Sequence, residues 1–344
     1  MIPRENAMND LTPAPRAFLL TGCAGFIGAN TTRMLLESGA QVVGWDNLND
    51  AYAAALKQWR LERLQEFPNF RFMKVDISRR EEILAAWNAL SSPRFEAIIH
   101  LAARAGVRYS VENPWTYIET NCIGTLNLLE LCRVRSIPKC VLASSSSVYG
   151  ETSVPILSED LPTQTPCSPY AASKIAGEGL AYAYHHLHGL DVSILRFFTV
   201  YGPAGRPDMS VLRFVHAIAE EKPLRLYGDG RQVRDFTYID DIARGVFCSL
   251  KKVGLGTFNL GGGAPSSVRD MIRIIADHLG KAPQVEYHPS HPADMESTQA
   301  DISRARSVLG WVPNVAFEEG LKRTIAWYLE NRSWVRSLAT LSGE

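Results

Sequence analysis

A tyrosine and a lysine four residues apart, Tyr170 and Lys174, are the side chains of this sequence that most directly indicate chemistry. They follow Ser168 and Pro169 at the start of a predicted helix, and their spacing places both on one helix face. A phenol is a poor base at neutral pH because its pKa is near ~10. A lysine ammonium ~4 Å away would stabilise the phenolate by roughly 4 kcal/mol at an effective dielectric constant of ~20. The pair could therefore remove a proton from an alcohol as a hydride leaves its carbon, although the same spacing is common on ordinary helices.

A glycine-rich turn near the start of the chain predicts a dinucleotide site. An apolar run at residues 17–21 leads into Gly22, Gly25 and Gly28, and a second apolar run after a helical pattern ends at Asp46. Glycines in such a strand–turn–helix unit let the backbone approach a pyrophosphate, and the helix N-terminus offers it unpaired N–H groups. An acid at the end of the second strand accepts a hydrogen bond from a ribose 2′-hydroxyl and repels a 2′-phosphate. The pattern therefore favours NAD over NADP.

Further apolar runs alternate with helical patterns and predict an α/β fold with a Rossmann-type, doubly wound parallel sheet. The runs lie at residues 70–75, 97–101, 140–143 and 192–195. Strands this apolar are buried on both faces, and ligand groups then collect at their carboxyl ends. His100 lies inside one run, and we interpret it as a structural histidine of the core. The predicted NAD-binding residues are Gly22, Gly25, Phe26, Ile27, Gly28, Asp46, Asn47, Asp76, Ile77, Leu101, Ala102, Ala103, Tyr170, Lys174 and Phe197.

The composition limits the class of protein. The chain has 344 residues, 46% of them hydrophobic, and a formal net charge of zero, so no overall charge favours nucleic acid or an anionic membrane. No apolar run approaches the ~20 residues that span a bilayer. Six cysteines are scattered without metal-ligand spacing, which indicates reduced thiols, a cytoplasmic protein and no metal site. Residues 1–15 are polar and contain prolines, and we expect a disordered leader there.

The character of the sequence changes after residue 198, where loops, arginines and short mixed elements replace the regular alternation. We expect residues 16–198, with a returning segment at about 238–262, to form an NAD-binding domain. Residues 199–237 and 263–344 would form a smaller, interleaved α/β lobe that binds substrate. The stretches 115–131 and 180–187 are apolar around most of a helix circumference, so each is either deeply buried or shared with a second subunit. We therefore expect a homodimer.

The glycine turn, Asp46, a serine-rich strand end, the pair of Tyr170 and Lys174, and an arginine-bearing second lobe together resemble the extended short-chain dehydrogenase/reductase family. The resemblance covers nearly all of the chain after residue 15. Within that family the sequence is most similar to nucleotide-sugar 4-epimerases, and specifically to UDP-glucuronate 4-epimerases, through residues 46–50, 105–110 and 196–209. The stretch 234–241 is shared more widely among nucleotide-sugar enzymes.

The resemblance implies roles for individual residues and a UDP-sugar as the substrate. Tyr170 would be the base, Lys174 its partner and a ribose ligand, and Ser145 the catalytic hydroxyl. Arg234 would bind the diphosphate and Arg206 the substrate carboxylate. The implied substrate-binding residues are Ser145, Ser146, Ser147, Thr199, Arg206 and Arg234. Galactose-type epimerases have a second diphosphate-binding arginine near residues 291–294, and this sequence has none there.

The implied reaction is an epimerisation at C4, in which a hydride leaves C4 for NAD, the 4-keto sugar turns about its diphosphate, and the hydride returns to the other face. Related dehydratases need carboxyl groups for acid–base work, and related UDP-glucuronate decarboxylases have a glutamate at the serine-rich motif. Residues 144–147 are all serine, which favours epimerisation. The alternatives are a 4-epimerase of UDP-glucose or UDP-N-acetylglucosamine, a UDP-glucuronate decarboxylase, a dehydrogenase that releases reduced cofactor, and an NAD-binding sensor on the same fold.

Overall fold

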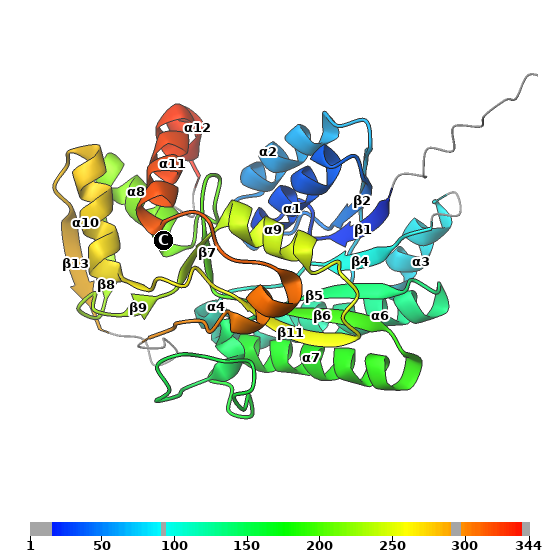
Figure 1. Cartoon of the computed structure of the whole chain (residues 1–344). Helices are drawn as coiled ribbons and strands as arrows, with labels where there is room; N and C mark the ends of the chain where they lie inside the picture. The colour runs from blue at the N-terminus through cyan, green and yellow to red at the C-terminus, as the bar shows by residue number, and fades with distance from the viewer. Residues whose placement is uncertain (1–15, 91–93, 290–296, 339–344) are drawn as a thin grey trace, which may run out of the picture.

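A seven-stranded parallel sheet forms the centre of the molecule (Figure 1). The computed structural model describes residues 16–90, 94–289 and 297–338, so the predicted leader at 1–15 lies outside the described residues. The strand order is β11-β6-β5-β4-β1-β2-β3, and each neighbouring pair is parallel. The chain thus leaves β1 toward β2 and β3 on one side and returns to β4 on the other. This confirms the predicted Rossmann-type, doubly wound sheet.

The strands of this sheet coincide closely with the apolar runs of the sequence. Alternate side chains of one strand enter different layers: Phe18 and Leu20 pack with Leu35, whereas Leu19 packs with Leu128. Both faces are therefore buried, as the continuous apolar runs require. The strands are β1 (Ala17–Thr21), β2 (Gln41–Asp46), β3 (Phe70–Lys74), β4 (Ala97–His100), β5 (Lys139–Ser145), β6 (Asp191–Phe197) and β11 (Leu255–Leu260).

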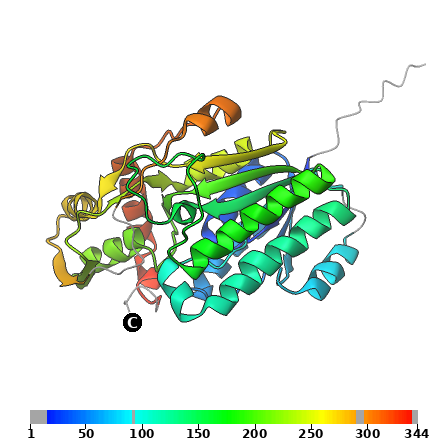
Figure 2. The same cartoon turned by 90° about the horizontal axis from the view of Figure 1, so that it is seen from below.

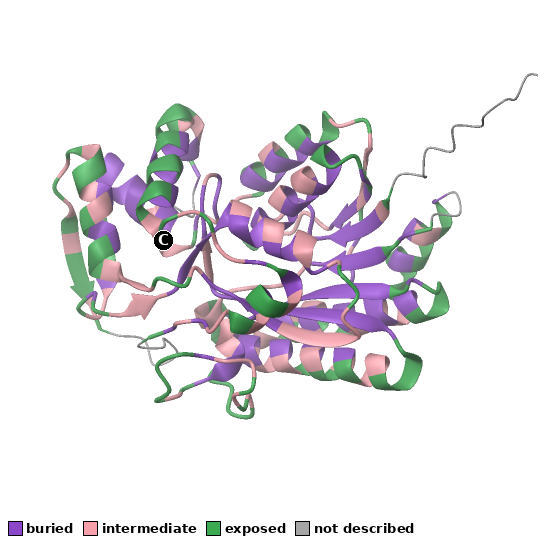
Figure 3. Ribbon diagram, viewed as in Figure 1, coloured by how far each residue is buried: buried purple, intermediate pink, exposed green. Residues whose placement is uncertain are grey.

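Helices cover the sheet on both faces. On one face lie α1 (Phe26–Glu37), α2 (Ala54–Gln65) and α9 (Ile239–Cys248), and on the other lie α3 (Arg80–Asn88), α6 (Gly124–Val134) and α7 (Pro169–His188) (Figures 1 and 2). The inner strands β1, β4, β5 and β6 are almost wholly buried, the edge strands β3 and β11 are partly exposed, and the outer faces of the helices are exposed (Figure 3). In the described ranges no helix is long and apolar enough to cross a membrane, and no cluster of three or more His, Cys, Asp or Glu residues is arranged to hold a metal ion.

A second group of elements packs beside the carboxyl ends of the strands. Its helices are α8 (Ser210–Ala219), α10 (Val268–Leu279), α11 (Phe317–Glu330) and α12 (Arg332–Val335). Its strands pair as β7 (Thr199–Tyr201) with β10 (Phe236–Tyr238), β8 (Pro223–Tyr227) with β13 (Gln284–His288), and β9 (Val233–Arg234) with β12 (Ser266–Ser267). Trp59 of α2 stacks on Trp334 at 6.0 Å between ring centroids and meets the edge of Trp327 at 5.7 Å. Helix α2 therefore joins the two groups of elements.

The helix that the sequence predicts at residues 115–131 is interrupted. It consists of α5 (Pro114–Tyr117), a π-helical turn η1 (Ile118–Ile123) and α6, and it follows the short helix α4 (Val107–Glu112). In the wide turn the side-chain amide of Asn121 accepts a hydrogen bond from the Arg104 N–H at 2.8 Å and donates one to the Arg104 carbonyl at 3.0 Å. The irregularity therefore ties this helix to the loop after β4.

Candidate active site

A cavity of about 710 Å³ opens at the carboxyl ends of the strands, between the sheet and the second group of elements. It is lined by every predicted site residue except Asp76. The glycine turn, the serine-rich strand end, the start of α7 and the loop after β7 therefore meet in one space. This is the convergence that parallel strands produce at their carboxyl ends.

The glycine turn has the geometry that a phosphate-binding turn requires. Gly22 has a φ of +77°, and a Cβ built there would lie 2.7 Å from the Ala102 nitrogen. A Cβ on Gly28 would lie 1.8 Å from the Gly22 carbonyl oxygen, so α1 can start this close to the glycine turn only because residue 28 has no side chain. Helix α1 has no side-chain cap, and Phe26, at its start, lines the cavity. The N–H groups of the first turn are thus available to an anion.

Asp46 closes the same corner of the cavity. Its carboxylate accepts hydrogen bonds from the Ala24 N–H at 3.0 Å and the Leu48 N–H at 2.8 Å, one on each oxygen. Each oxygen keeps a lone pair, so the carboxylate can also accept bonds from ribose hydroxyls. Asp76, by contrast, lies behind the cavity wall: it accepts a hydrogen bond from the Asn47 side chain at 3.0 Å and two from Ser78. Asp76 positions Asn47, which does line the cavity.

His100 has the contacts of a structural residue. It is buried at the end of β4, with one ring nitrogen 2.9 Å from the Thr21 hydroxyl and the other 3.0 Å from the Thr125 hydroxyl. Burial, aided by the charge of Lys174, lowers the pKa of His100 to about 3. The ring is therefore neutral and fully bonded, and it plays no part in the proton chemistry below.

The tyrosine and lysine occupy the first turns of α7. Ser168 caps this helix by accepting a hydrogen bond from the Ala171 N–H at 3.1 Å, and Pro169 occupies the first turn. Burial raises the pKa of the Tyr170 phenol, while a hydrogen bond with Ser145 and the charge of Arg206 act in the opposite direction. The phenol and the Ser145 hydroxyl are thus hydrogen-bonding neighbours across two elements.

The Lys174 side chain reaches β5. Its Nζ donates to the Ala143 carbonyl at 2.9 Å, and burial lowers the pKa of this ammonium to about 8, with the charge of Glu178 acting in the opposite direction. The cation whose charge lowers the pKa of Tyr170 is Arg206, which the sequence did not indicate for this purpose. Lys174 lines the cavity beside the phenol.

The serine-rich end of β5 is held from below by a buried ion pair. Ser145 accepts a hydrogen bond from the Ser147 N–H at 3.2 Å and begins the 3₁₀ turn η2 (Ser146–Tyr149). The Ser144 hydroxyl donates to Glu178, which pairs with Arg196 through two hydrogen bonds of 3.0 and 2.7 Å. The Glu178 carboxylate therefore lies near the serines, but Arg196 neutralises it and it does not line the cavity.

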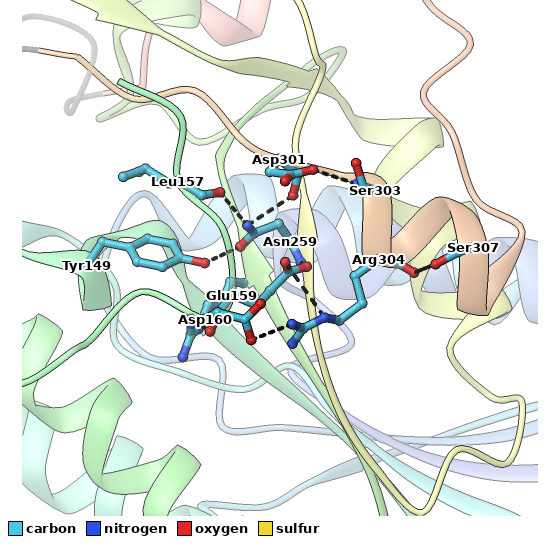
Figure 4. Close-up of polar contacts among 10 residues, drawn as sticks. Tyr149, Leu157, Glu159, Asp160, Asn259, Asp301, Ser303, Arg304 and Ser307 are labelled. Carbon is cyan, nitrogen blue, oxygen red and sulfur yellow. Dashed lines mark hydrogen bonds and ion pairs between the residues drawn. The ribbon is translucent and has the colours of Figure 1, made fainter. Parts of the chain in front are cut away.

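A second set of polar contacts fixes the outer end of the serine motif (Figure 4). The Tyr149 hydroxyl donates to the Asn259 side-chain oxygen at 2.6 Å. Asn259 in turn donates to the carbonyls of Leu157 at 2.8 Å and Asp301 at 3.1 Å. The end of β11, the loop after η2 and the segment near residue 301 are thereby locked together, close to the π-helical turn η3 (Ala305–Leu309).

Arg206 reaches the cavity from the loop after β7. Its guanidinium donates two hydrogen bonds to the Asp208 carboxylate, at 3.0 and 2.5 Å, and one to the Ala105 carbonyl at 3.3 Å. Thr199, at the start of β7, is half-buried and also lines the cavity. The sequence did not indicate the pairing with Asp208, a carboxylate that competes with any anion for this arginine.

The cavity also contains arginines that the sequence interpretation missed. Arg108, Arg213 and Arg225 line it together with the predicted Arg234, and they come from α4, α8, β8 and β9. Arg108 lies over the ring of Tyr227 at 4.0 Å. Burial lowers the pKa of Arg213, and the charges of Arg108 and Arg225 lower it further. Such a group of cations is suited to a multiply charged anion. Residues 291–294, where an arginine is missing, lie outside the described residues.

Comparisons with known proteins agree with this geometry. The model of the family described as GDP-mannose 4,6 dehydratase matches residues 19–324. A UDP-glucuronate 4-epimerase from Thermodesulfobacterium geofontis is 52% identical over 322 residues, which cover 93% of this chain and 98% of the relative. The crystal structure of a UDP-glucuronic acid 4-epimerase from Bacillus cereus, in complex with UDP-glucuronic acid and NAD, has a TM-score of 0.85 and 36% identity over 92% of this chain and 99% of that one.

The fold alone does not separate activities within this group. A dTDP-glucose 4,6-dehydratase from Streptomyces venezuelae, solved with NAD bound, also has a TM-score of 0.85, with 32% identity over 94% of this chain and 99% of that one. Activity must therefore be assigned from the site. Matched over most of its length, the chain belongs to the extended short-chain dehydrogenase/reductase family, in the group described by the GDP-mannose 4,6 dehydratase model.

Proposed function

We propose that this protein is an NAD-dependent 4-epimerase that interconverts UDP-glucuronate and UDP-galacturonate. The observation that carries the proposal is the meeting of three features in one cavity: the glycine turn, the pair of Tyr170 and Ser145, and Arg206. The relatives with this activity support it, in the sequence comparison and in the structural one.

The residues of the glycine turn fit NAD. The uncapped start of α1 would hold the pyrophosphate, and Asp46 would accept bonds from the adenosine ribose while its charge disfavours a 2′-phosphate. Lys174 would hold the second ribose. When bound, NAD supplies a hydride acceptor and donor for C4 of the sugar.

Tyr170 acts as the base that takes the C4 hydroxyl proton, and it returns the proton at the end of the reaction. Ser145 donates to the C4 oxygen and keeps it in line with the phenol. Burial raises the pKa of the phenol and so holds it protonated before substrate binds, whereas the hydrogen bond with Ser145 and the charge of Arg206 favour its ionised form when the proton is needed.

A uronate substrate must be protected against decarboxylation, whereas a neutral sugar has no carboxylate to lose. Its 4-keto form is a β-keto acid, which loses CO2 when the breaking bond aligns with the ketone π-system. We assign Ser146, Ser147, Thr199 and Arg206 to the substrate carboxylate, held in one orientation that prevents this alignment. A loose carboxylate would give decarboxylation, the second candidate reaction at this site.

The sugar must turn while the nucleotide stays fixed. Arg234, with Arg108, Arg213 and Arg225, would hold the diphosphate, so that the missing arginine near residue 291 is replaced from other elements. We accordingly retain the division into an NAD-binding domain (16–198 and about 238–262) and a nucleotide-sugar lobe (199–237 and 263–344). The pyranose then pivots about the diphosphate to present its other face.

We also propose that the protein is a cytoplasmic homodimer. The six cysteines are free thiols. Trp115 is 76% exposed, Tyr182 is 61% exposed and Leu187 is 68% exposed, and they lie on the interrupted helix and on α7. Large apolar side chains exposed on adjacent helices are typical of a subunit interface.

The direct test is incubation of the purified protein with UDP-glucuronate, UDP-glucose and UDP-N-acetylglucosamine in separate reactions, followed by proton NMR. We expect inversion at C4 of UDP-glucuronate, no steady accumulation of NADH, and no pentose product. Faster inversion of UDP-glucose or UDP-N-acetylglucosamine would move the assignment to those substrates. Release of CO2 would identify a decarboxylase, and retained NAD without turnover would identify a sensor.

A further inference from the structure

Arg60 of α2 is a buried cation that joins the glycine turn to the loop before Arg206, two segments whose neighbouring residues Gly25 and Arg206 line the cavity. Its side chain is hardly exposed, and its Nη1 donates to the Ala24 carbonyl in the glycine turn at 3.2 Å. Its Nε and Nη2 donate to the Ala204 carbonyl at 3.2 and 2.6 Å, and Nη2 also reaches the Gly205 carbonyl at 3.3 Å. Among the residues that the structure describes, no carboxylate forms an ion pair with it. A buried charge without a counter-ion is costly unless its donors are satisfied, and here backbone carbonyls satisfy them.

Two of the carbonyls that Arg60 binds, those of Ala204 and Gly205, belong to a tight turn directly before Arg206. The Gly205 N–H donates to the Gly202 carbonyl at 3.1 Å, which closes the turn. Ala204, its third residue, has a φ of +51°, a conformation that residues with a Cβ rarely adopt. Two N–H groups of Arg60 on the Ala204 carbonyl hold the peptide in this orientation.

The position of Arg60 relative to the cofactor-binding turn is fixed as well. The Tyr52 hydroxyl accepts a hydrogen bond from Nη1 at 2.7 Å, and the guanidinium lies 5.7 Å from the ring centre of Phe26 at the start of α1. One residue earlier on α2, Trp59 packs between the tryptophans of α11 and α12. The helix that carries Arg60 is thus anchored on both sides of the cavity.

We infer that Arg60 is a positioning residue: it sets the turn before Arg206 against the glycine turn, and through Arg206 it determines the preference for a uronate. The inference rests on the proposed function. A lysine at position 60 keeps the charge but has a single donor head, so it cannot hold the Ala24 and Ala204 carbonyls together. The turn would then relax, and Arg206 would lose its fixed place beside Ala105.

A double-mutant cycle tests this coupling. The four proteins are the wild type, Arg60→Lys, Arg206→Lys and the double variant, each assayed with UDP-glucuronate and UDP-glucose. We expect Arg60→Lys to raise KM for UDP-glucuronate about 10-fold, with kcat changed less than about 3-fold, and to lower the preference for uronate by a similar factor. In the Arg206→Lys background the same substitution should change the preference by less than about 2-fold. Ala204→Gly, which removes the cost of the positive φ, is added to Arg60→Lys. It should restore at least half of the uronate preference that Arg60→Lys loses, measured on a logarithmic scale.

Arg63→Lys is the matched control, because Arg63 lies one turn along α2, is exposed, and stacks on Trp59. It should leave KM and preference unchanged. A purely structural role would lower kcat in proportion to lost folded protein and NAD content at constant preference, and that result would overturn the inference. The inference would also be overturned if Arg60→Lys had its full effect on the preference in the Arg206→Lys background. If Arg60→Lys does not fold, Tyr52→Phe removes one partner of the guanidinium; its smaller rise in KM must also vanish in the Arg206→Lys background.

Failure of the proposed function would be visible separately. It would appear as absent C4 inversion by the wild type. Calorimetric dissociation constants of UDP-glucuronate and UDP for the same four proteins then decide the inference, since a positioning role requires the coupling to persist in binding. Additive binding effects would reject it.

Discussion

Replacing Glu178 by glutamine tests how the reacting side chains are supported. Glu178 follows Tyr170 and Lys174 at the same four-residue spacing, and it accepts hydrogen bonds from Arg196 and Ser144. The Glu178 and Arg196 side chains are only 12% and 6% exposed. Removing one charge of such a pair costs about 3 kcal/mol, because the other charge stays buried and unpaired. A chain of 344 residues has an unfolding entropy of about 0.7 kcal/mol/K, so Tm should fall by roughly 4 °C in a thermal scan.

The same variant should also change the pH dependence of kcat. Burial lowers the pKa of Lys174 to about 8 and the Glu178 carboxylate opposes this, so without that charge the pKa falls further. Lys174 then loses its proton at a lower pH, and the alkaline limb of kcat, recorded by NMR from pH 6 to 10, should move to lower pH. Asp160→Asn is the control, because the Asp160–Arg304 pair is exposed and should shift Tm by less than about 1 °C. An unchanged Tm and an unchanged profile in the glutamine variant would refute the reasoning.

Three further outcomes are expected. Lys174→Met removes a lysine whose pKa of about 8 in the folded protein lies below its pKa in the unfolded chain. Between these pKa values the unfolded wild type binds one more proton than the folded wild type, so the stability of the wild type relative to the variant should rise by about 2 kcal/mol between pH 7 and 9.5. A difference that stays constant with pH in urea unfolding would contradict this. Tyr170→Phe should lower kcat about 10³-fold with bound NAD unchanged, and a rate above a tenth of the wild type would be inconsistent with a phenolate base. Trp115→Asp should yield a monomer of 38.1 kDa by light scattering, whereas a persisting dimer would place the interface elsewhere.

The regular part of the fold could be predicted because local sequence determines it. The run at 17–21 is β1, and the helix that starts with Pro169 is α7. The glycine turn was equally clear, since Gly22 and Gly28 stand where backbone packs on backbone and no side chain fits. The periodicity of apolar residues and the residue types of a turn can both be recognised within a few residues of sequence.

The arginines of the cavity could not be predicted in the same way. Arg108, Arg213 and Arg225 lie on different elements, and their meeting depends on how the second group of elements packs. One signal was present: Arg213 is the single arginine of α8, a helix that is otherwise almost entirely buried. The pairing of Arg206 with Asp208 is local, since only Pro207 lies between them, but nothing in the sequence showed that the two side chains turn toward each other.

Only some of the buried residues that hold the site in place could be predicted from the sequence. Glu178 could have been found, because it continues the four-residue spacing of Tyr170 and Lys174 on one helix face. Arg60 could not, since the backbone carbonyls that it binds lie 36 and 144 or more positions away along the chain. The sequence predicts that Asp76 binds the cofactor because it follows a strand; in the structure its carboxylate accepts hydrogen bonds from Asn47 and Ser78, and its neighbours Val75 and Ile77 line the cavity.

Isotope transfer at the sugar carbon tests the proposed chemistry most directly. UDP-glucuronate carrying deuterium at C4 is incubated with the protein in ordinary water, and the UDP-galacturonate formed is examined by NMR and mass spectrometry. If one hydride leaves C4 and returns to its opposite face, the product keeps the deuterium at C4. Product with solvent hydrogen at C4 would contradict this, because inversion would then proceed by proton exchange and not by the site that Tyr170 and the glycine turn form.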